Sequence, residues 1–187
     1  MIRGRFKAKR ARLVPKGIKR GKTRPRGKLQ ALWGQYGLLV PRYRRYSGRK
    51  GIYWYLFSKE IRARDYREHG GLCMTCLKYV EKGSDQCGHL FPARDCGFLL
   101  LFEPRNNHLQ HSKCNNPRFT PGAGIYNTIN IEARYGAGTV AKLAATKLLK
   151  GKEWSQKEYD ERIKEKNRPH LPPRERISYP LVMFDNQ

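Results

Sequence analysis

The chain has 187 residues, a length that suits one domain with a modest core and some appendages. Its net charge of +25 and pI of about 10.3 are extreme for a globular protein and indicate a polyanionic partner. The first fifty residues hold 18 Lys and Arg and no acidic residue, whereas all 15 acidic residues lie at or after Glu60. This asymmetry favours nucleic acid as the partner over an ordinary solvated tail.

The sequence carries no sign of secretion or of a membrane segment. Residues 1–20 lack the apolar core of a signal peptide, and no window reaches the roughly 18 apolar residues that span a bilayer. Five cysteines leave at least one unpaired once a metal site is filled, which argues against a framework of disulfides. We therefore expect a protein of the reducing cytoplasm with no membrane partner.

The first 51 residues are expected to form a basic nucleic-acid-binding arm. Residues 1–30 alternate cations with glycine and proline and carry too little apolar surface to offset the entropy of ordering, so an extended arm is predicted. Residues 31–47 place aromatic rings among Arg42, Arg44 and Arg45, a mixture that suits base stacking and phosphate neutralisation. Alternatively, Trp33 and the apolar run after it pack on the folded domain.

Residues 52–69 are predicted to form a helix. Apolar residues recur there with helical spacing, and two glycines then end the helix. Arg62 and Arg64 would lie on its outer face, where we expect them to contact nucleic acid.

The elements after this helix are shorter. Strands are predicted from Leu77 to Val80 and in the stretch leading into His89, followed by a loop over 92–105. Helices are predicted over 125–134, 139–149 and 155–166, the last opened by a capping box at Ser155. Four prolines make an extended tail the expectation for the last twenty residues.

Two residue pairs have the spacing of a structural zinc site. Cys73 and Cys76 are separated by two residues, and His111 and Cys114 have the same gap. Thiolates and imidazoles at this gap lie on short turns that let both side chains reach one ion, so a Cys3His site for Zn2+ is predicted. His108 is an alternative to His111, although the two-residue gap favours His111. The two remaining cysteines lack partners at ligand spacing and are interpreted as core thiols, of which Cys87 is the one that could compete for metal because it lies near His89.

Between and beside these pairs lie one histidine and several asparagines that a structural zinc does not need. The order of features along the chain is that of a ββα-metal (HNH-type) nuclease site: a zinc pair, a strand with His89, a loop with Asn106, a second zinc pair and then Asn115. In such a site a neutral histidine takes a proton from the attacking water while a divalent ion holds the scissile phosphate. We interpret His89 as the general base and Asn115 as a ligand of Mg2+ or Mn2+, although Asn115 alternatively caps a helix. Asn106 fixes either the histidine or the loop backbone.

These motifs together resemble the phage NinG/Rap recombination protein family from about residue 54 to residue 166. The matching features are FSKEIRAR at 57–64, CMTC at 73–76, Gly88-His89 with Phe91, Phe102 followed by Arg105-Asn106, then His108, Gln110 and Cys114-Asn115, EARYGAGT at 132–139 and WSQKEY at 154–159. The resemblance implies a structure-selective endonuclease that cuts branched recombination intermediates such as Holliday junctions and D-loops. The zinc knuckle is also similar to that of phage endonuclease VII resolvases, in which an Asn after the last zinc cysteine binds the catalytic metal.

The sequence departs from the family pattern at three positions. His111 stands where the family usually has cysteine, Gln86 where it usually has aspartate, and Gly88 where many HNH sites have an acidic ligand. A second ligand for the catalytic metal is therefore open. The candidates are Asp85, Asp95 and Glu103, of which Asp85 lies beside Gln86.

The resulting expectation is an α+β protein with a ββα-metal (HNH-like) zinc-knuckle core and flanking helices over 52–167, between a basic arm over 1–51 and a tail over 168–187. It would be a phage protein in the host cytoplasm that acts on branched DNA, as a homodimer joined by its C-terminal helices. Two rival interpretations remain: a non-catalytic zinc-ribbon nucleic-acid-binding protein that resembles a ribosomal protein, and a generic HNH nicking endonuclease.

Overall fold

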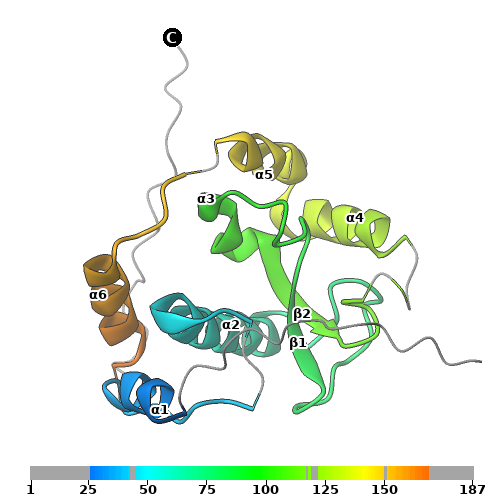
Figure 1. Ribbon diagram of the computed structural model, residues 1–187. Helices are drawn as coiled ribbons and strands as arrows, with labels where there is room; N and C mark the ends of the chain where they lie inside the picture. The colour runs from blue at the N-terminus through cyan, green and yellow to red at the C-terminus, as the bar shows by residue number, and fades with distance from the viewer. Residues whose placement is uncertain (1–25, 43–44, 117, 119–121, 150, 169–187) are drawn as a thin grey trace, which may run out of the picture.

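The computed structural model describes residues 26–42, 45–116, 118, 122–149 and 151–168 (Figure 1). Within these ranges helices surround a small two-stranded antiparallel sheet, which agrees with the expected α+β class. In chain order the elements are α1 (Arg26–Gly34), α2 (Gly48–Glu68), β1 (Asp85–His89), α3 (Phe98–Leu101), the 3-10 helix η1 (Pro104–Asn106), β2 (Asn107–His111), α4 (Ala123–Tyr135), α5 (Thr139–Leu148) and α6 (Gln156–Lys166).

The long helix α2 is the element on which the others pack. It contacts α1, α6 and both strands, and Figure 1 shows it between α6 and the sheet. It begins four residues earlier than predicted, because Ser47 is extended and already serves as its N-cap. Gly70 and Gly71 follow its end with positive φ angles, as the sequence indicated.

Aromatic rings fill the core between α2, α3 and α6. The ring of Tyr53 meets Phe102 at 4.9 Å and Trp154 at 5.0 Å, both edge to face, and Phe98 meets Trp154 at 4.8 Å. Such pairs each contribute about 0.5–1.5 kcal/mol beyond burial. The stretch 92–105, predicted as a loop, therefore contains the buried helical turn α3 and most of η1.

The first helix corrects part of the expected arm. Residues 26–30, predicted as extended, belong to α1, and Trp33 at its end is 1% exposed. The Trp33 ring packs edge-on against Tyr55 of α2 at a centroid distance of 5.4 Å, and this burial stabilises the helix. The alternative in which Trp33 packs on the domain is thus confirmed, and the expected boundary at residue 51 falls inside α2. The arm before residue 26 and the tail after residue 168 lie outside the described residues.

The sheet pairs β1 with β2, and of the two predicted strands it contains the one that leads into His89. The register sets Asp85 opposite His111 and His89 opposite Asn107. The stretch from Leu77 to Val80, predicted as a strand, contributes only an isolated bridge between Tyr79 and Leu72. The prediction missed β2 because its polar residues, buried by their neighbours, do not alternate with apolar ones.

The helices after the sheet follow the sequence closely. Observed and predicted ends of α4 and α5 agree within two residues, and α6 begins after Ser155. The Ser155 hydroxyl accepts from the N–H of Glu158 while the Glu158 carboxylate accepts from the N–H of Ser155, so the predicted capping box is confirmed. None of the helices in the described ranges is both long enough and apolar enough to cross a membrane.

The buried carboxylate of Asp65 joins α2 to β2 and α4. It accepts from the backbone N–H of Leu109 at 2.7 Å and from Arg64 Nε at 2.8 Å, and Arg134 of α4 lies 3.8 Å away. Asp65 is completely buried, so this charge depends on its partners for stabilisation.

We predict that Asp65→Ala lowers the free energy of unfolding by about 3–5 kcal/mol, because it leaves the Arg64 charge and the Leu109 N–H without their partner. Urea unfolding of the metal-loaded protein measures this loss. The matched control is Glu68→Ala in the same helix, because Glu68 is exposed and pairs with the exposed Arg67, so a change within about 0.5 kcal/mol is expected. Equal effects of both substitutions would contradict the role given to Asp65.

Candidate functional site

Four side chains converge on one point at the end of the sheet. The ligand atoms of Cys73, Cys76, His111 and Cys114 all lie within 4.8 Å of one another. This is the Cys3His group predicted from the sequence, and the donor set suits a tetrahedral metal such as zinc.

Two turns bring these ligands together. In the turn after α2, the N–H of Leu77 donates to the carbonyl of Cys73, and Leu77 takes a left-handed φ of 56°. In the turn after β2, the N–H of Asn115 donates to the carbonyl of His111 at 2.9 Å. The first turn carries both cysteines of one pair, and the second returns Cys114 to the strand end.

The orientation of His111 is fixed by a backbone carbonyl. Its Nε2 lies 3.0 Å from the carbonyl oxygen of Tyr79, which only accepts, so Nε2 carries the proton. Its Nδ1 is then the free lone pair and lies 3.4 Å from the Cys76 sulfur. A ligating imidazole held in this way by its second nitrogen is typical of metal sites.

His108 is not an alternative ligand. It is buried, its Nε2 lies 2.6 Å from the carbonyl oxygen of Arg105, and its Nδ1 lies 3.3 Å from Arg64 Nη2. The choice of His111 over His108 is therefore borne out by the geometry.

The thiols of the Cys3His group differ in their pKa values. Burial acts to raise the pKa of Cys73, but hydrogen bonds from backbone N–H groups, first that of Cys76, bring it down to about 7. Burial and the neighbouring sulfurs of Cys73 and Cys76 raise the pKa of Cys114 to about 12. The thiols cannot all ionise together without a cation among them, which is the charge that a divalent metal supplies.

We predict one zinc ion per chain, and its loss in Cys114→Ser together with a lower unfolding midpoint, because metal binding is coupled to folding. Elemental analysis and thermal unfolding provide the measurements. Cys96→Ser is the matched control, since Cys96 lies outside the group and its weak bond to the carbonyl of Phe91 suits a hydroxyl as well. A folded Cys114→Ser protein that keeps its zinc would show that the ligand set is wrong.

The residue after the last ligand, Asn115, lies against β1. Its Nδ2 donates to Gln86 Oε1 at 2.9 Å, and its Oδ1 lies 2.6 Å from the point where a Cβ would stand on Gly88. Asn115 is in a turn and α4 begins only at Ala123, so the alternative role as a helix cap is wrong.

Gln110 is the residue that the sequence interpretation left without a role. Its Nε2 donates to Thr75 Oγ1 at 2.8 Å and to Asn127 Oδ1 at 3.2 Å, which turns its Oε1 toward Gly88. That oxygen is buried and has no hydrogen-bond partner among the described residues. Two carboxamide oxygens, of Gln110 and Asn115, therefore converge beside Gly88, and such oxygens are ligands that hard cations accept.

His89 lies on the other face of β1. Its ring stacks on Trp54 of α2 at 5.0 Å, and its buried Nε2 has no hydrogen-bond partner in the described part of the chain. Side chains alternate along a strand, so Gln86 and Gly88, which Asn115 contacts, face away from α2. In this geometry the two residues interpreted as the general base and the metal ligand of one site point to different faces of β1.

Burial makes His89 a neutral imidazole. Burial first, and then the positive charge of Arg45, lower the pKa of His89 to about 3 from its ordinary 6.5. Between about pH 6.5 and about pH 3 the histidine is therefore protonated in the unfolded chain but not in the folded chain. The free energy of unfolding falls as the pH decreases through this range.

We predict that His89→Gln reduces this acid sensitivity. Between about pH 7 and about pH 5.5, wild-type protein should lose about 1 kcal/mol more of its unfolding free energy than the variant. Urea unfolding at the two pH values measures the difference, and loss of metal at low pH affects both proteins alike. Parallel losses would contradict the burial of a neutral imidazole.

Asn106 fixes the loop and not the histidine ring. It is completely buried, its Oδ1 accepts from the N–H of Phe91 at 2.9 Å, and its Nδ2 donates to the carbonyl of Leu100 at 3.0 Å and to the sulfur of Cys96. Of the two roles left open for Asn106, the structure provides the structural one.

The acidic candidates for a second cation ligand are all engaged by arginines. Asp85 pairs with Arg62 at 2.8 Å, and Glu103 pairs with Arg105 at 2.9 Å. Asp95 lies 3.5 Å from Arg94 on the surface. None of the three faces the two carboxamide oxygens as a free carboxylate.

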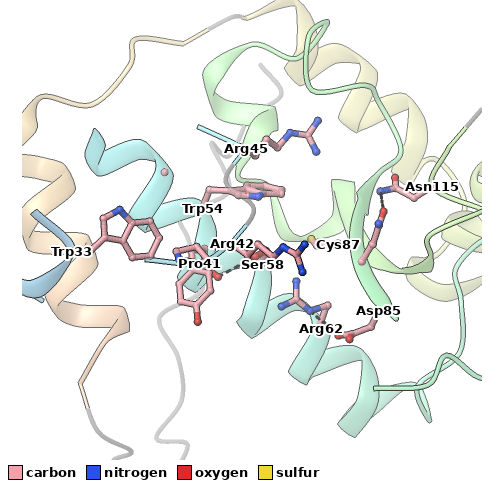
Figure 2. Close-up of a pocket in the computed structure, with 13 residues that line it drawn as sticks. Trp33, Pro41, Arg42, Arg45, Trp54, Ser58, Arg62, Asp85, Cys87 and Asn115 are labelled. Carbon is pink, nitrogen blue, oxygen red and sulfur yellow. Dashed lines mark hydrogen bonds and ion pairs between the residues drawn. The ribbon is translucent and has the colours of Figure 1, made fainter. Parts of the chain in front are cut away.

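A pocket of about 640 Å3 lies between α2, β1 and the segment before α2 (Figure 2). Arg42, Arg45 and Arg62 line it, beside Asp85 and Asn115. It therefore brings together three of the arginines and two of the site residues that the sequence singled out.

Arg64 is not among the residues that line this pocket. It donates to the carbonyls of Pro104 and Asn107 and pairs with Asp65, so its guanidinium points inward and not to the outer face that the sequence predicted. Its contact with nucleic acid stays a prediction. Arg44 lies outside the described residues.

No family model matches the chain, and no curated protein and no solved structure matches it at a significant level. The family resemblance drawn from the sequence motifs therefore stays a proposal.

Proposed function

We propose that this protein is a metal-dependent endonuclease that cuts branched DNA, as members of the NinG/Rap family do. The observation that carries the proposal is the turn closed by Cys114, which sets the Asn115 carboxamide against Gly88, one residue before a neutral histidine. In the proposed reaction a water oxygen attacks the phosphorus, His89 takes the water proton, and the bond from phosphorus to the leaving oxygen breaks.

A divalent cation at this edge would stabilise the charge that develops on the leaving oxygen. The residues present fit it in part. Asn115 and Gln110 offer two neutral oxygens, but every acidic candidate is paired with an arginine. Mg2+ in proteins often takes its remaining ligands from substrate phosphate and water, so we propose that binding of the cation depends on DNA.

The proposal also requires the His89 ring to leave its stack on Trp54 and turn toward the same phosphate. The stack is a contact worth about 0.5–1.5 kcal/mol, which is small compared with the energy of DNA binding. Arg45 lies over the same Trp54 ring at 5.4 Å, so a phosphate that attracts Arg45 would also alter the surroundings of His89.

A homodimer is part of the proposal because a four-way junction presents two equivalent strands to be cut. The apolar side chains available for it are on α4, where Ile125, Tyr126 and Ile129 are exposed. They agree with the expected use of the C-terminal helices.

One observation favours a second candidate, a zinc-stabilised nucleic-acid-binding protein without catalysis. His89 and Asn115 lie on opposite faces of β1, and each already has a structural partner, Trp54 and Gln86. The basic pocket would serve such a binder equally well.

We predict that zinc-loaded protein with Mg2+ cleaves a synthetic four-way junction and leaves linear duplex of the same sequence intact. His89→Ala should reduce the rate about 10²- to 10⁴-fold, because it removes the general base. Asn115→Ala should reduce cleavage and raise the Mg2+ concentration needed. His69→Ala is the matched control, because His69 caps the far end of α2 and is outside the site.

Each other outcome decides between the candidates. Junction binding without cleavage of either substrate would favour the non-catalytic protein, and equal cleavage of both would favour a generic nicking enzyme. Selective cleavage that survives His89→Ala would overturn the assignment of the base alone.

A further inference from the structure

The pocket beside the site has the size and chemistry of a nucleotide-binding pocket. Its volume of about 640 Å3 lies within the range of small-ligand sites, which is about 300–1,000 Å3. Figure 2 shows it open between the aromatic side chains on one side and the strand that carries Asp85 on the other.

One part of its wall is apolar. Trp33, Pro41, Trp54, Tyr55 and Cys87 contribute to this wall. His89 stacks on the Trp54 ring, Arg45 lies over that ring and Trp33 is almost completely buried, so a nucleobase would meet the guanidinium plane of Arg45 beside this wall. A guanidinium plane accepts any nucleobase, since every base has a π-face.

The rest of the wall is cationic. Arg42 and Arg45 lie on the segment before α2, and Arg62 enters from α2 itself. Arg62 is neutralised by Asp85, whereas Arg45 lies over the rings of Tyr46 and Trp54, hydrogen-bonds Tyr46 and has no acidic partner among the described residues. A guanidinium beside an aromatic wall binds phosphate with its donors and stacks on bases with its plane.

From these features we infer that the pocket takes up a single unpaired nucleotide of the DNA, with its base stacked on the Arg45 guanidinium beside the apolar wall and its phosphate at the cationic part of the wall. A base inside a duplex cannot enter, because it is paired and stacked on both sides. An unpaired nucleotide enters without that cost, and branch points supply such nucleotides.

Resting on the proposed function, this inference names what the protein recognises in branched DNA. Asn115 lines the same pocket, so a nucleotide held there brings its backbone to the edge where the two carboxamide oxygens converge. Recognition of the unpaired nucleotide would then place the neighbouring phosphodiester for cleavage.

Ser58 allows the pocket to be filled without a change of charge. It lines the pocket from the middle of α2, and its hydroxyl donates to the carbonyl of Tyr55 in the same helix. Ser58→Leu places a larger side chain in the pocket, and Ser58→Ala removes the hydroxyl but leaves the space open.

The test measures binding of the full zinc-loaded chain to an end-labelled duplex with one unpaired thymidine and to the same duplex fully paired. Fluorescence anisotropy with Ca2+ in place of Mg2+ gives both dissociation constants without cleavage. We expect wild type and Ser58→Ala to prefer the probe with the unpaired nucleotide about tenfold, and Ser58→Leu to lose that preference while its affinity for paired duplex is unchanged.

A second pair of variants covers the case in which Ser58→Leu does not fold, as judged by zinc content and thermal unfolding. Arg45→Ala should lower the preference, whereas Arg94→Ala, which removes the same charge from an exposed site outside the pocket, should weaken both probes equally.

Equal binding of both probes by wild type would overturn the inference and leave a pocket that contacts only backbone phosphate. A preference that persists in both Ser58→Leu and Arg45→Ala would likewise overturn it. These outcomes are independent of catalysis. If the protein cuts junctions but binds both probes equally, the proposed function stands and this inference is wrong. If it prefers the unpaired nucleotide but cuts no DNA, this inference stands and the proposed function is wrong.

Discussion

The fold around the site depends on the Cys3His group, whose four ligands lie on two turns that a metal ion such as zinc would cross-link. A two-stranded sheet is marginally stable by itself, and the apolar cluster beside the ligands has only Cys73, Val80 and Leu109 as fully buried members. The large aromatic core lies elsewhere, between α2, α3 and α6. The end of the sheet next to the Asn115 turn therefore has little apolar area to stabilise it and depends on the Cys3His group and on the polar bonds of Asp65.

The acidic residues explain why so basic a chain has a definite binding surface. Several of them hold an arginine in a structural role: Asp65 holds Arg64, and Asp160 of α6 receives both Arg49 and the hydroxyl of Tyr36. The pair of Asp160 with Arg49 connects α6 to α2, the Asp65 carboxylate also binds the backbone of β2, and both carboxylates neutralise cations that would otherwise add to the surface potential. Arg42 and Arg45, on the segment before α2 that contains no acidic residue, keep the wall of the pocket positive.

The sequence predicted correctly the features that depend on residues close together in the chain. The Cys3His group, the helices α4 and α5 and the capping box of α6 follow from spacing and end signals, and the structure has them. The helix α1, the buried turn α3 and the strand β2 were missed because their stability comes from partners distant in sequence, as the contact of Trp33 with Tyr55 illustrates.

The relative orientation of the His89 and Asn115 side chains could not be predicted from the sequence, for a different reason. Which face a strand residue takes depends on the register with its partner, and a slip of one residue reverses it. The pattern around His89 contains no apolar alternation that would fix this register in advance. The role of Gln110 could not be predicted, because its carboxamide oxygen is left without a hydrogen-bond partner only once Thr75 and Asn127 bind the nitrogen of the same group.

The close approach at Gly88 couples the residues at positions 88 and 110. The space that any side chain at 88 would need is occupied by the Gln110 oxygen, 1.5 Å from the Cβ position. An aspartate there would displace the Gln110 carboxamide, which would break its bonds to Thr75 and Asn127 and so weaken the attachment of α4. An acidic group beside His89 and a firmly anchored α4 are therefore competing demands on the same small volume.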